Sequence, residues 1–85
     1  RSGDRRSAIS FYRHTAALVP AEIEPRRVLA LALAADEQFA EAIPEQEAVI
    51  RDDPDDLEAW LLLGEFNVKA GRADDGAKAY AAYEL

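Results

Sequence analysis

Residues 57–71 read LEAWLLLGEFNVKAG, and this stretch decides the fold. Trp60, Leu63, Gly64 and Asn67 follow the i, i+3, i+4, i+7 spacing that places side chains on one face of an α-helix. The apolar residues do not alternate with polar ones, as they would in a half-buried strand. The stretch therefore predicts an amphipathic helix with a large aromatic anchor and a small residue on its packed face.

The residues on either side of this stretch are typical of helix ends. Asp55 and Asp56 offer side-chain oxygens that can cap a helix beginning at Leu57, and Pro54 ends the segment before it. Gly71 can adopt the left-handed conformation that separates two antiparallel helices. We therefore expect a helix pair over residues 57–84.

The same features recur upstream at a constant spacing of 34 residues, which we call the repeat period. Identical residues pair at this offset, among them Pro20 with Pro54, Leu29 with Leu63, and Ala8 with Ala42. The period predicts a lone second helix at about 4–19, a helix pair at about 24–51, and the pair at 57–84. The expected architecture is five antiparallel helices in two and a half repeats.

This pattern resembles the tetratricopeptide repeat, whose signature places tryptophan, Leu-Gly, a turn glycine, an aromatic residue and proline at fixed distances. The repeat at 57–85 matches best, through Trp60, Leu63, Gly64, Gly71 and Tyr80. The opening segment keeps Gly3, Ala8, Tyr12 and Pro20, at the positions of a second helix whose first helix is missing. The resemblance covers nearly the whole chain.

The repeat at 23–54 departs furthest from the signature. It keeps Leu29, Ala30, Ala42 and Pro54, but Arg26, Glu37 and Gln46 replace the tryptophan, the turn glycine and the aromatic residue. Pro44 falls inside its second helix, where proline removes a backbone donor and crowds the carbonyl four residues back. We therefore expect that helix to start late or to kink, after a longer, irregular connection around 37–42.

The resemblance implies an all-α fold, a right-handed superhelix of stacked helix pairs forming one domain over residues 1–85. The chain starts at Arg1 without methionine and stops at Leu85 within an amphipathic segment, so we expect a fragment of a longer array. The alanine and arginine bias favours a bacterial source. For a soluble bacterial protein the sequence leaves the compartment open between cytoplasm and periplasm. We expect another repeat or domain to cover Ile9, Phe11 and Tyr12 in the natural protein. In the isolated fragment these residues would lack a covering helix, which predicts self-association through the exposed end of the stack.

In the family, the first helices of the repeats line a concave groove that holds a peptide or protein. By resemblance, the groove positions here are Glu24, Arg27, Leu31, Ala35, Glu58, Leu61, Glu65, Val68 and Lys69. The subgroup that grips a C-terminal carboxylate needs asparagine where Leu31 and Glu65 stand and lysine where Leu61 stands, so this chain does not match it. Carboxylates mixed with aliphatic groups favour a basic, amphipathic ligand.

The composition limits the other classes of function. A net charge of −7 disfavours nucleic acid and anionic membranes as partners, and no apolar run is long enough to span a bilayer. The chain has no cysteine, and the single histidine, His14, has no second ligand or nucleophile beside it, so we expect a surface residue. The Asp52–Asp56 run lacks the ligand spacing of a calcium loop, and helix capping explains it better.

These observations predict a protein-interaction adaptor or scaffold rather than an enzyme, with no cofactor and no metal. The alternative is a non-binding spacer or docking module attached to a catalytic domain such as a glycosyltransferase.

Overall fold

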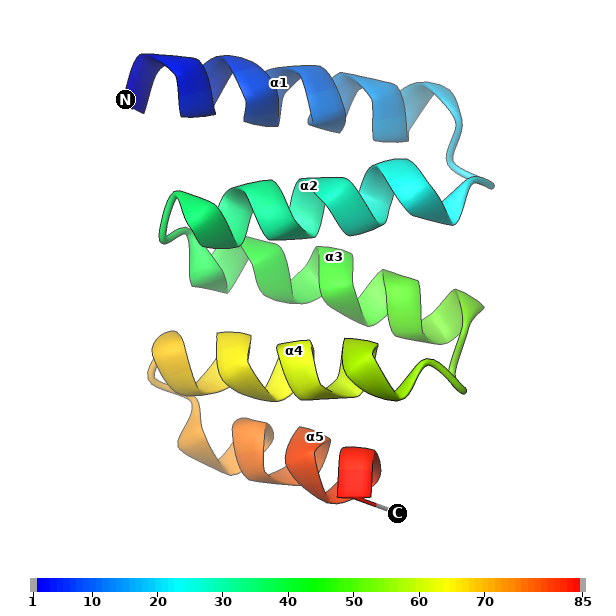
Figure 1. The fold of residues 1–85 in the computed structure, drawn as a ribbon, viewed down its shortest axis with the longest axis vertical. Helices are drawn as coiled ribbons and strands as arrows, with labels where there is room; N and C mark the ends of the chain where they lie inside the picture. Colours follow the sequence, from blue (N-terminus) through cyan, green and yellow to red (C-terminus); the bar gives the residue numbers. More distant parts are fainter. Residues whose placement is uncertain (1, 85) are drawn as a thin grey trace.

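The computed structural model describes residues 2–84, and this range contains five α-helices and no strand. They are α1 (Ser2–Leu18), α2 (Ile23–Ala35), α3 (Phe39–Asp52), α4 (Leu57–Lys69) and α5 (Ala73–Glu84). Each helix packs against its neighbours in the chain. They follow one another along the long axis of a flat molecule of 36 × 27 × 14 Å, with α1 and α5 at opposite ends (Figure 1).

The repeat period governs where the helices begin and end. Both ends of α4 lie one period after the ends of α2, α5 begins one period after α3, and α3 ends one period after α1. The outer ends of the lone helix and of both helix pairs lie within two residues of their predicted positions. The all-α repeat fold predicted from the sequence is confirmed.

The two turns inside the helix pairs, 36–38 and 70–72, have the same backbone hydrogen bonds. The N–H groups of Gln38 and Arg72 donate to the carbonyls of Leu33 and Asn67, at 2.8 and 2.7 Å. The residue before each donor is left-handed, with φ of 62° at Glu37 and 84° at Gly71. Each turn is therefore the same helix C-terminal motif, built once on glutamate and once on glycine.

The prediction of a longer, irregular connection around 37–42 is wrong. The turn takes only residues 36–38, α3 begins at Phe39, and the helix runs to Asp52 with Pro44 inside it. Because Pro44 is exposed and lies one turn after the start of α3, the helix loses a single backbone hydrogen bond there and keeps its buried face. The C-terminal motif at Glu37 fixes where α3 starts, which the proline could not reveal.

The core follows the interfaces between successive helices, because each helix buries one stripe of its surface. Buried apolar residues from all five helices form one cluster, which comprises Ile9, Ala16, Leu29, Ala30, Leu33, Ala42, Ile43, Val49, Ile50, Ala59, Leu63, Phe66 and Ala79. Small residues allow α4 and α5 to come close together. A Cβ atom on Gly64 would lie 2.9 Å from the Tyr80 ring, and one on Gly76 would lie 3.0 Å from the Gly64 carbonyl oxygen.

The sequence predicts that Ile9, Phe11 and Tyr12 lie uncovered at the end of the stack. This prediction is correct for Phe11 and wrong for Ile9 and Tyr12. Ile9 is buried and Tyr12 packs against the core cluster, because both side chains face α2. Phe11 is 65% exposed, and Leu18 on the same helix is 68% exposed. The apolar surface that α1 leaves open therefore consists of Phe11 and Leu18.

Candidate protein-binding surface

The nine predicted groove residues all lie on α2 and α4, the first helices of the two helix pairs. Their spacing of three or four residues places them on one side of each helix. Seven are exposed, and Arg27 and Leu61 are partly buried. Among the exposed ones, Leu31 and Val68 retain 45% and 49% of their accessible surface. We call this set of nine residues the α2/α4 face.

Arg27 joins the α2/α4 face to the start of α4. Its Nη1 donates to Asp56 Oδ2 at 2.7 Å, and its Nε donates to Glu24 Oε1 at 3.1 Å. The other oxygen of Asp56 accepts from the backbone N–H of Ala59 at 3.3 Å and so caps α4. One aspartate therefore ends the turn, starts a helix and holds the arginine of the preceding repeat.

These contacts pair the positive charge of Arg27. Partial burial lowers its pKa, but hydrogen bonds to Asp56 and Glu24 outweigh this effect, and the pKa is raised above its ordinary value. The guanidinium, which is charged at physiological pH in any environment, is already paired with two carboxylates. Its role is structural, and it offers little free charge to a ligand.

The remaining charges of the α2/α4 face are mainly negative. Glu58 and Glu65 form no ion pair with another described side chain. Lys69 lies at the far end of α4, with its Nζ 6.0 Å from the centre of the Phe39 ring. The surface between Glu58 and Lys69 therefore combines free carboxylates with exposed aliphatic side chains.

The family model of the tetratricopeptide repeat matches residues 33–85, more than half of the chain. The chain belongs to the tetratricopeptide repeat family. No curated protein matches the sequence. Tetratricopeptide repeats generally mediate protein–protein interaction, and the family consists typically of non-catalytic interaction modules.

The tetratricopeptide signature explains the packing of the residues that carry it. Trp60 is partly buried against the core, and its indole N–H donates to the Pro54 carbonyl at 3.0 Å, so the two signature residues hold each other. Gly64 gives room to the Tyr80 ring. The residues that replace the signature in the earlier repeat have other partners, since Arg26 pairs with Glu45 at 3.8 Å and Gln46 donates to the Ala59 carbonyl at 3.0 Å.

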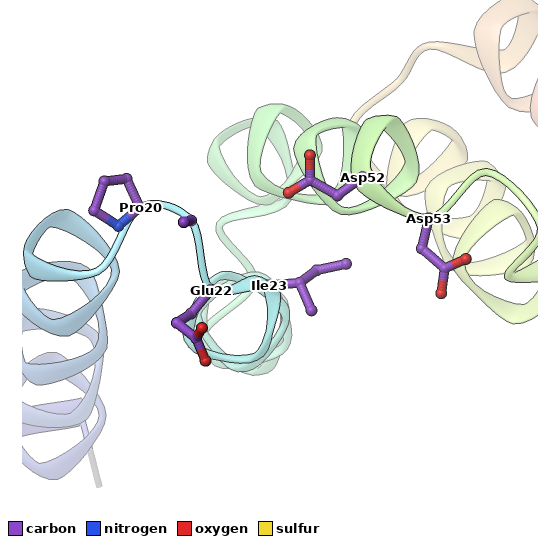
Figure 2. A pocket seen from close by; sticks show the side chains of 6 residues that line it. Pro20, Glu22, Ile23, Asp52 and Asp53 are labelled. Carbon is purple, nitrogen blue, oxygen red and sulfur yellow. The ribbon is translucent and has the colours of Figure 1, made fainter.

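One open hollow lies beside the turns between repeats. It is an open depression of about 600 Å³, lined by Pro20, Ala21, Glu22, Ile23, Asp52 and Asp53. Figure 2 shows its carboxylates pointing in different directions around Ile23. They do not converge on one point, and no cluster of histidine and acidic side chains in residues 2–84 is arranged to hold a metal ion.

The structure also concerns three other sequence predictions, on membrane spans, His14 and Asp56. Within residues 2–84, no helix is long and apolar enough to cross a membrane. His14 is exposed on α1, as predicted. Asp56 was predicted as a cap but not as the partner of Arg27, since a contact between helices of different repeats follows from their packing and leaves no local pattern in the sequence.

Proposed function

We propose that this chain is an adaptor or scaffold that binds a basic, amphipathic segment of a partner protein on the α2/α4 face. The proposal rests on the composition of the α2/α4 face. This face combines the exposed apolar side chains of Leu31 and Val68 with the free carboxylates of Glu58 and Glu65. An amphipathic helix with lysine or arginine beside its apolar stripe matches this surface in both respects. Arg27 does not oppose such a ligand, because its charge is paired with Asp56 and Glu24.

The test is a charge reversal that leaves the fold intact. Glu58→Lys with Glu65→Lys changes two exposed carboxylates, whereas Asp52→Lys with Asp55→Lys makes the same change in net charge at the end of α3 and in the turn that follows it. Binding of a synthetic lysine- and leucine-rich helical peptide is measured by calorimetry, and helicity by circular dichroism. We expect the first variant to lose binding by about tenfold or more and the control to lose much less.

Equal losses in the two variants would show that net charge alone attracts the peptide. Absence of binding to the native chain would favour the alternative role, a rigid spacer or docking module beside a catalytic domain such as a glycosyltransferase.

We also propose that residues 1–85 form one repeat domain within a longer array, in a bacterial cytoplasmic or periplasmic protein. The support for the array comes from the phase of the repeat: α1 occupies the place of a second helix, equivalent to α3 and α5. In such an array, Phe11 and Leu18 would lie against the first helix of the repeat to which α1 belongs. In a chain without that helix, these two residues form a surface for self-association.

A further inference from the structure

Two adjoining hollows lie on another part of α4, between α3 and α5. They have volumes of about 240 and 390 Å³, and both are lined by Glu47, Trp60 and Leu63. None of the residues that line them belongs to the α2/α4 face. We call the two together the Trp60 hollow. The hydrogen bond from the Trp60 indole N–H to the Pro54 carbonyl fixes the orientation of the ring. The ring therefore gives the hollow a rigid, partly exposed aromatic wall.

Three cations line the Trp60 hollow, each from a different element. Arg51 is on α3, Arg72 is in the turn before α5, and Lys78 is on α5. None of them forms an ion pair with another described side chain, whereas Arg5, Arg13, Arg26 and Arg27 each do. Two carboxylates, Glu47 and Asp75, also line the hollow. Its balance is three positive against two negative charges, in a chain with a net charge of −7.

The equivalent hollow of the preceding repeat has neither an aromatic wall nor unpaired cations. It lies one period earlier and is lined by Arg13, Ala16, Ala17, Pro20, Arg26, Leu29 and Glu45. Arg26 stands in the place of Trp60, and Ala17 in the place of Arg51. Its two arginines are neutralised, Arg26 by Glu45 at 3.8 Å and Arg13 by Glu41 at 3.5 Å. The repeat fold therefore does not require unpaired cations and an aromatic ring in the hollow at this position.

We propose that the Trp60 hollow is a second docking site, for an acidic peptide segment of a partner protein. One apolar side chain of that segment packs against the Trp60 ring, and its flanking carboxylates bind Arg51, Arg72 and Lys78. Tryptophan and arginine are the residue types that most often dominate binding energy at interfaces. The site goes beyond the proposed function, because it lies on another surface and selects the opposite charge.

The experiment uses Trp60 as its own reporter, since it is the only tryptophan of the chain. Three synthetic peptides are titrated: one rich in aspartate with a central leucine, one with serine in place of that leucine, and one with lysine in place of the aspartates. We expect the first peptide alone to shift the emission of Trp60 and protect it from acrylamide quenching. Equal responses to all three peptides would overturn the proposal, and so would no response to the first.

A matched pair of variants tests the cations. Arg51→Glu with Lys78→Glu reverses two charges in the hollow, and Arg5→Glu with Arg6→Glu reverses two exposed charges on α1. We expect the first variant to weaken binding of the acidic peptide by about tenfold or more, and the second much less. Equal weakening by the two variants would assign the effect to net charge and refute the site. A correctly folded Glu58→Lys, Glu65→Lys variant should keep the Trp60 response, which separates this site from the α2/α4 face.

Discussion

Glu37 carries the conformation that glycine has at the same place in the next repeat. Its φ of 62° is in the left-handed region, which costs an L-residue roughly 1–2 kcal/mol and glycine almost nothing. We predict that Glu37→Gly raises the free energy of unfolding by about 0.5–1 kcal/mol, because the relief of strain exceeds the added entropy of the unfolded chain. Urea unfolding monitored by circular dichroism measures the change.

Glu65→Gly is the control for Glu37→Gly. Glu65 is exposed in the middle of α4, where glycine destabilises a helix by about 1 kcal/mol. The two substitutions should thus change stability in opposite directions. If Glu37→Gly is also destabilising, strain at the turn is not what limits the stability of the middle repeat.

The sequence predicts the roles of residues that act locally better than the roles of residues that act across helices. Pro20, Pro54, Asp56 and Gly71 act on the backbone beside them, so their effects could be predicted from local sequence. The replacements in the middle repeat act across helices. Gly64 lies against Tyr80, and one period earlier the larger Ala30 occurs together with the smaller Gln46, so the two positions change together. One sequence alone shows this pairing only after the fold is known.

At the scale of the helices, Asp56 connects two repeats through one carboxylate. It caps α4 through one oxygen and binds Arg27 of α2 through the other. We predict that Asp56→Ala lowers the free energy of unfolding by about 1–2 kcal/mol, from the lost cap and the lost ion pair together. Asp56→Asn should cost less, because its amide oxygen still caps the helix. Thermal and urea unfolding of both variants distinguish the two contributions.

The matched control for Asp56 is Glu24→Ala. Glu24 binds the same arginine but is 71% exposed, so its ion pair should contribute under about 0.5 kcal/mol. A loss at Glu24 as large as that at Asp56→Ala would mean that Arg27 stabilises the fold mainly through its own helix. The link between repeats at Asp56 would then have little importance.

The outer ends of the lone helix and of both helix pairs were predictable from the repeat, but the start of α3 and its tolerance for proline were not. Pro44 alone suggested a late or kinked helix, because a proline in a helix interior usually breaks it. Two longer-range effects prevail: the turn at Glu37 sets the start of α3, and six buried side chains hold the rest of the helix against its neighbours. Neither effect is visible in the sequence around Pro44.

The flat stack is open at α1, and the period shows what its outer surface would contact. Phe11 corresponds to Glu45 of α3 and to Ala79 of α5, which lie one and two periods further along the chain. Ala79 is buried in the core, and Glu45 pairs with Arg26 of α2, so this position faces the first helix of its own repeat. In α1 the same position exposes Phe11, with Leu18 two helical turns further on. The repeat geometry therefore places Phe11 where the first helix of its repeat would pack, and we propose that Phe11 and Leu18 together form a contact surface between two stacks.

We predict that Phe11→Glu with Leu18→Glu abolishes concentration-dependent self-association without lowering the melting temperature. Both side chains are about two-thirds exposed, and the residues that hold α1 on α2, among them Ile9 and Ala16, are unchanged. Sedimentation velocity over a range of protein concentrations measures the association. Leu57→Glu is the control, because Leu57 is 51% exposed on α4, away from α1. A native chain that stays monomeric throughout, or a double variant that still associates while Leu57→Glu does not, would show that the open end of the stack is not a contact surface.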